Sequence, residues 1–104
     1  MTNDERKRVV VTGLGAITPI GNTVTEYWGG LMNGRNGIGP ITLFDASRHD
    51  CRFAGEVKGF DPLLYLDRKE AKRMDRFAQF AVSASKQAVA DAQFVINDLN
   101  AEQV

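Results

Sequence analysis

Residues 9–21 read VVVTGLGAITPIG, and this stretch decides how the N-terminal part of the chain folds. Residues 8–12 contain three consecutive valines followed by threonine, a β-branched run without alternation, which predicts a central strand buried on both faces. Gly13 and Gly15 follow at once, as glycines do where a phosphate group rests on a helix N-terminus. The stretch therefore allows two interpretations, a nucleotide-binding loop or a tight structural turn.

The nucleotide-binding interpretation requires residues that this stretch lacks. A dinucleotide fingerprint, G-x-G-x-x-G/A, needs a small third residue where Thr18 stands, and Pro19 prevents an ordinary helix from starting there. The short-chain dehydrogenase variant needs glycines in place of Ile17 and Pro19, and no Gly-Lys-Ser/Thr phosphate loop is present. A nucleotide-dependent oxidoreductase is thus disfavoured, and a structural role for the glycines is favoured.

The bulk composition is that of an ordinary soluble protein. The 104 residues allow one domain at most, and 13 basic against 13 acidic side chains leave no net charge to attract nucleic acid or a membrane surface. The sequence shows neither a signal peptide nor a run of about 20 apolar residues. A single cysteine, Cys51, favours a reducing compartment. We expect a cytoplasmic protein, or a plastid stromal protein without its transit peptide.

Helix-start signals place the first elements. Thr23 followed by Glu26 is a capping box, which predicts a helix ending at residues 33–34. Its expected buried face comprises Trp28, Leu31 and Met32. Residues 34–52 are expected to be irregular, anchored by Ile41 and Phe44, before a weak strand over residues 52–58.

The second half is predicted to be helical. Asp61 and Pro62 give an N-cap and first position for a short helix through Leu66. Asp67 marks a second helix start. One long helix is expected over residues 69–92, and its small side chains allow close packing. The first strand lacks neighbours, so we interpret residues 1–104 as the N-terminal portion of a larger α/β domain, with no complete domain boundary inside the chain. Poor stability in isolation is expected, because strand edges stay unpaired.

The segments together resemble a known enzyme family. VVVTGLGAITPIGN, NGRNGIGPITLFD, FAGEVKGFDP and RKEAKRMDRFAQFAVSASKQAVADA resemble the start of β-ketoacyl-acyl-carrier-protein synthases, and the match is closest to the type II elongation enzymes of fatty-acid synthesis. The resemblance implies part of a thiolase-like α-β-α-β-α fold of five layers. It also implies a homodimer, no cofactor and acyl carrier protein as partner. The implied reaction is decarboxylative condensation of an acyl thioester with malonyl-carrier protein.

The family's nucleophilic cysteine and two histidines match nothing in this chain, so no catalytic residue is assigned here. Cys51 and His49 lie two residues apart in a polar segment. A pair so close in sequence rarely has the geometry of a nucleophile and its base. Structural or surface roles are expected for both side chains.

A basic cluster is the one candidate functional patch. On one continuous helix, Lys69, Lys72, Arg73 and Arg76 would share a face and attract an acidic partner. The plain alternative is a solvated helix face, and a single short patch does not indicate nucleic-acid binding. The family resemblance implies that Lys69, Lys72 and Arg73 dock the acidic carrier protein, with Arg68 and Arg76 as flanking candidates.

A second function remains open from the sequence. A chain-length-factor-like or polyketide-type ketosynthase homologue would have the same fold and docking surface, and the chain-length-factor type would lack the catalytic cysteine. The residues that distinguish these proteins from a fatty-acid synthase have no counterpart in this chain.

Overall fold

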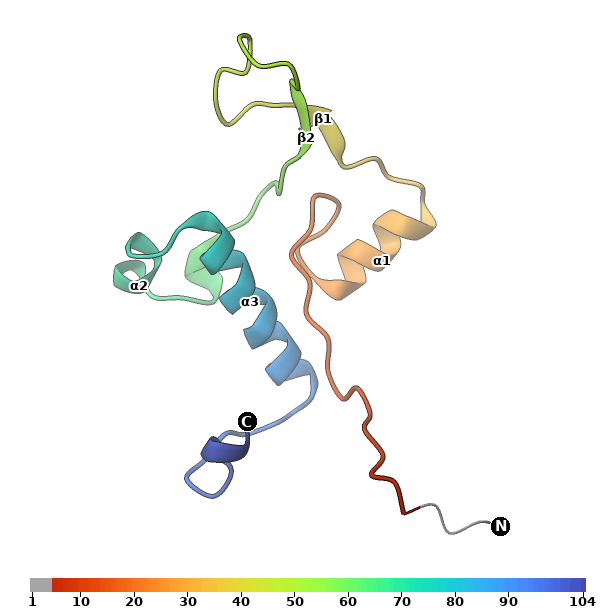
Figure 1. Ribbon diagram of the computed structural model, residues 1–104, viewed down its shortest axis with the longest axis vertical. Coiled ribbons are helices and arrows are strands. Elements are labelled where there is room, and N and C mark those ends of the chain that lie inside the picture. Colours follow the sequence, from red (N-terminus) through yellow and green to blue (C-terminus); the bar gives the residue numbers. More distant parts are fainter. Residues whose placement is uncertain (1–4) are drawn as a thin grey trace.

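The computed structural model describes residues 5–104. The helices are α1 (Val24–Met32), α2 (Arg68–Lys72) and α3 (Arg76–Asp91), with short 3-10 turns η1 (Pro62–Leu64) and η2 (Ala101–Gln103). Strands β1 (Ile38–Pro40) and β2 (Phe53–Gly55) pair antiparallel, with Gly39 opposite Ala54. Figure 1 shows the N-terminal segment running out alone, with the β1–β2 pair at the opposite end of the molecule.

The chain is open rather than packed around one core. Its radius of gyration is 18.3 Å, whereas a compact domain of this length has about 13 Å. Within residues 5–104, the only buried apolar residues are Ala46, Leu66 and Ala71. Many large apolar side chains are exposed, so most apolar faces of these elements have no partner in the described part of the chain.

The two glycines of the opening stretch lie against α3. A Cβ atom on Gly13 would stand 2.2 Å from the Ala88 carbonyl oxygen, and one on Gly15 would stand 1.9 Å from the Ala84 carbonyl oxygen. Such distances leave no room for a side chain, so only glycine allows the extended segment to approach the helix this closely. The structural interpretation of the glycines is confirmed.

Side chains of α3 also bind the backbone of this segment. The Leu14 amide donates to Asp91 Oδ2 at 2.9 Å, and the Ala16 amide donates to Gln87 Oε1 at 2.9 Å. Gln87 Nε2 in turn donates to the Asn22 carbonyl at 2.7 Å and to the Tyr65 hydroxyl at 2.8 Å. One glutamine therefore joins the N-terminal segment, the start of α1 and the region after η1.

The strand predicted over residues 8–12 is wrong for this chain. No β-ladder forms there within residues 5–104, and Val9 is 94% exposed rather than buried. In the described residues, β1 and β2 form a two-stranded sheet that does not include this segment. The segment lies extended (Figure 1) and ends in a tight turn that Thr18 and Gly21 close by backbone hydrogen bonds of 2.8 and 3.3 Å.

Helix α1 begins as predicted but buries a different face. Thr23 Oγ1 accepts from the Glu26 amide at 3.1 Å, and Glu26 Oε2 accepts from the Asn22 amide at 2.8 Å. The helix ends at Met32, with Asn33 as C-cap and Gly34 following at φ +65°. The expected burial of Trp28, Leu31 and Met32 is wrong, since all three are exposed; Gly30, beside Ile20, is the buried residue of this helix.

The excursion between residues 34 and 52 contains β1, which the sequence did not predict. β2 lies inside the weak strand expected over residues 52–58. Phe44 does not anchor the loop in a core, because it is exposed and instead makes an edge-on contact with the His49 ring at 5.7 Å. Glu56 does the anchoring: its carboxylate accepts from the Thr42 hydroxyl at 2.8 Å and from the Leu43 amide at 3.1 Å.

The first prediction concerns Gly15. Gly15→Ala is expected to lower the free energy of unfolding by about 2 kcal/mol or more, because the new methyl group overlaps backbone atoms of α3. Urea unfolding of the protein measures it. Gly29→Ala is the matched control, since a Cβ on Gly29 meets nothing within 4 Å and alanine favours a helix interior. Equal stability of the two variants would contradict the packing described above.

The second prediction concerns Glu56. Hydrogen bonding to the Thr42 side chain, with smaller contributions from the Leu43 and Thr42 amides and from Lys58, lowers the pKa of Glu56. Its contribution to stability is present above the ordinary glutamate pKa of about 4.3 and is lost as the pH falls through the lowered pKa. Amide exchange at Thr42 and Leu43, corrected for intrinsic rates, should lose protection over that range. In Glu56→Gln the protection should no longer follow pH there.

Candidate functional site

The basic cluster lies on α2 and the residue that ends it. Asp67 caps α2 through its Oδ1, which accepts from the Glu70 amide at 2.7 Å. Ala71 turns inward and is buried, whereas Arg68, Lys69, Lys72 and Arg73 are exposed. Within residues 5–104 these four cations make no hydrogen bond or ion pair through their side chains. They therefore form a positively charged surface that is available to a partner.

The single long helix predicted over residues 69–92 is wrong. α2 ends at Lys72, and α3 begins after Asp75, whose backbone is extended at φ −67° and ψ 161°. Gln79 Nε2 donates to the Ala71 carbonyl at 2.9 Å and so supplies a partner to a carbonyl near the end of α2. The break means that Arg76 does not share a helix face with Lys69, Lys72 and Arg73.

Arg76 is exposed but makes contacts that tie it to the rest of the structure. Its Nη2 donates to the Val57 carbonyl at 2.8 Å, and its guanidinium carbon lies 5.0 Å from the centre of the Phe80 ring. Phe80 also meets Phe60 edge-on at 5.1 Å. Arg76 thus ties the start of α3 to the segment that follows β2.

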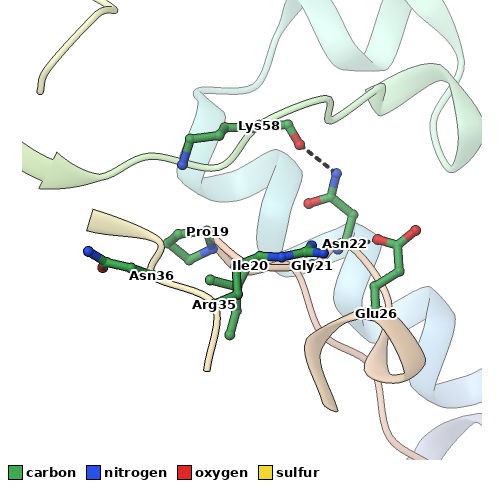
Figure 2. A pocket seen from close by; sticks show the side chains of 8 residues that line it. All are labelled: Pro19, Ile20, Gly21, Asn22, Glu26, Arg35, Asn36 and Lys58. Atoms are coloured by element: carbon green, nitrogen blue, oxygen red, sulfur yellow. Dashed lines mark hydrogen bonds between the residues drawn. The ribbon is translucent and has the colours of Figure 1, made fainter. Parts of the chain in front are cut away.

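A small pocket lies where the N-terminal turn meets α1. Its volume is about 270 Å³, and Figure 2 shows its lining residues, which include Asn22, Glu26, Arg35 and Lys58. Asn22 Nδ2 donates to the Lys58 carbonyl at 2.8 Å, and Lys58 Nζ donates to the Gly37 carbonyl at 3.4 Å. These polar groups hold three segments together, so the pocket is a structural junction rather than a reactive centre.

Cys51 and His49 form no reactive pair. The exposed Cys51 Sγ lies 3.3 Å from the Phe53 carbonyl oxygen, whereas the His49 ring contacts Phe44. In the part of the chain that the structure describes, no cluster of histidine, cysteine and carboxylate side chains could hold a metal ion. None of the helices in that part has the length and apolarity to cross a membrane.

The family follows from the sequence match over nearly the whole chain. Residues 6–104 match the family model of the β-ketoacyl synthase N-terminal domain. The chain belongs to this family. The ketosynthase segment is 71% identical over all 104 residues to 3-oxoacyl-[acyl-carrier-protein] synthase 2 of Synechocystis sp.. It is 46% identical over 100 residues to the protein of the same name in Coxiella burnetii.

The ketosynthase segment also matches solved ketosynthase structures. The ishigamide ketosynthase/chain length factor is 42% identical, with a TM-score of 0.78 over 86% of this chain and 22% of that one. A β-ketoacyl synthase from Burkholderia phymatum is 33% identical, with a TM-score of 0.70 over 89% of this chain and 23% of that one. The expected fold, part of a thiolase-like α/β domain, is confirmed. The segment spans about a quarter of the curated relatives it matches, 25% and 24% of their lengths.

Some structural residues of the ketosynthase segment were missed by sequence reasoning. Gln79, Gln87 and Asp91 all bind backbone atoms of other segments. A signal was available: Gln87 and Asp91 lie four residues apart among small side chains, and so on one helix face. Polar groups on a face that packs closely against backbone are well placed to bind it.

The third prediction concerns Arg76. Arg76→Gln is expected to lower the free energy of unfolding by about 1 kcal/mol or more, because a charged hydrogen bond and a cation–π contact are lost together. Arg68→Gln, which removes an exposed cation without a side-chain partner, should change it by less than about 0.5 kcal/mol. Urea unfolding of both variants tests this difference, and a similar loss in each would contradict the assigned role of Arg76.

Proposed function

We propose that this chain is the N-terminal segment of a 3-oxoacyl-[acyl-carrier-protein] synthase, an acyltransferase that elongates acyl chains in fatty-acid biosynthesis. The observation that carries the proposal is the 71% identity, over the whole chain, to a relative of that name. The complete enzyme would move an acyl group from carrier protein to a cysteine thiolate. Loss of carbon dioxide from malonyl-carrier protein would then give the carbanion that attacks the thioester.

The condensing activity is tested with the complete protein and with acyl- and malonyl-loaded carrier protein as substrates. Formation of 3-oxoacyl-carrier protein with release of carbon dioxide is the expected result. Binding of carrier protein without either product would instead favour the non-catalytic chain-length-factor-like homologue. The names of the curated relatives support the synthase over that alternative.

Lys69, Lys72 and Arg73 are proposed to dock the carrier protein. Their support is physical, because they are exposed cations without side-chain partners in residues 5–104. An acidic partner would gain charge complementarity and faster encounter there. The helix break leaves these three residues together on α2 and its C-cap, whereas the flanking candidate Arg76 lies on α3 and bonds to the Val57 carbonyl.

The fourth prediction reverses two of these charges. Lys69→Glu with Arg73→Glu, in the complete enzyme, should weaken carrier-protein binding at least tenfold at low salt and flatten its salt dependence. Lys7→Glu with Arg48→Glu is the matched control, since it changes net charge equally at exposed positions away from α2. Unchanged affinity and salt slope in the first variant would show that the carrier protein docks elsewhere.

The assembly and location of the complete protein are further proposals. A homodimer in the cytoplasm, or in a plastid stroma, is expected from the family resemblance. Sedimentation of the purified enzyme and fractionation of the source cells test these two points.

A further inference from the structure

Two neighbouring leucines lie exposed beside the basic surface. Leu63 and Leu64 belong to η1, which directly precedes α2, and they are 47% and 73% exposed. Leu66, two residues on, is buried at 5%. Leu66 is therefore buried beneath the surface, whereas Leu63 and Leu64 lie on it.

The turn that carries these leucines is held from several sides. Asp61 Oδ1 accepts from the Leu63 amide at 3.0 Å, which caps the turn. The Tyr65 carbonyl accepts from Lys86 Nζ at 2.6 Å, and the Tyr65 hydroxyl accepts from Gln87. These bonds fix the Leu63 amide and the residue that follows Leu64, and both leucines are exposed in this chain.

The cations next to the leucines indicate the chemistry of the surface that would cover Leu63 and Leu64. Arg68, Lys69, Lys72 and Arg73 lie on α2 and its C-cap, beside η1, and all four are exposed without side-chain partners in the described residues. A cover of uncharged protein surface over this region would bury cations without compensation, which is costly. An acidic surface with an apolar side chain at its centre would satisfy both the leucines and the cations.

We propose that Leu63 and Leu64 form an apolar anchor for the carrier protein, adjacent to the cations that attract it. This inference rests on the proposed docking function and adds a second kind of contact to it. The cations govern the encounter and its salt dependence, whereas the leucines hold the docked complex by excluding water. The partner surface must therefore present an exposed apolar side chain beside its carboxylates.

The fifth prediction separates these two contributions in the complete enzyme. Leu63→Gln with Leu64→Gln should weaken binding of acyl carrier protein about five- to tenfold, mainly through faster dissociation. The slope of affinity against salt should stay as in the unchanged enzyme, because apolar contacts are not screened. Leu63→Met with Leu64→Met, which keeps apolar surface, should retain affinity within about twofold. Binding is measured at low and high salt.

The outcomes distinguish this inference from the docking function on which it rests. If the glutamine variant binds normally while the Lys69 and Arg73 charge reversal weakens binding, the anchor is wrong and the docking function stands. If neither variant affects binding, the docking surface itself is wrong. If the glutamine variant lowers the melting temperature or dissociates the unliganded enzyme, and the methionine variant does not, the leucines are covered within the enzyme and the anchor is overturned.

Discussion

The close approach between the N-terminal segment and α3 is the constraint on which the rest of the structure depends. Gly13 and Gly15 permit the approach, since a Cβ on either would overlap the Ala88 or Ala84 carbonyl. Contact alone would leave backbone amides without partners, and Asp91 and Gln87 supply acceptors for them. Along one side of this segment, two side-chain acceptors on α3 thus bind amides that a neighbouring strand would otherwise bind.

The features that the sequence predicted correctly are local ones. The caps at Thr23, Asp61 and Asp67 form as expected, because each involves a side chain and an amide two or three residues away. The glycine pair was also assigned correctly to structure, since Pro19 already excluded a phosphate-binding helix. Of the candidate site, the residue types and their exposure on α2 followed from the sequence, while the docking role stays a prediction.

The predictions that were wrong concern features that depend on contacts between residues far apart in sequence. β1 contains Gly39 and Pro40, which disfavour strands, and exists because β2 pairs with it. The helix break after Lys72 was not predicted, because residues 73–75 contain no glycine or proline. The Gln79 side chain helps to stabilise this break by bonding to the Ala71 carbonyl. The segment at residues 8–12 has strand composition, but composition supplies no partner, so the predicted burial did not appear.

The same helix that receives the glycine segment also positions the basic surface. Gln79, near the start of α3, bonds to the end of α2, and Lys86 and Gln87 hold Tyr65 beside η1. Gln87 therefore bonds both to the N-terminal segment and to Tyr65, the residue that follows Leu63 and Leu64. Because these contacts converge on α3, this helix links the basic surface to the N-terminal segment. A carrier protein held at α2 would then be oriented relative to the ketosynthase domain as a whole, which binding to a mobile loop would not achieve.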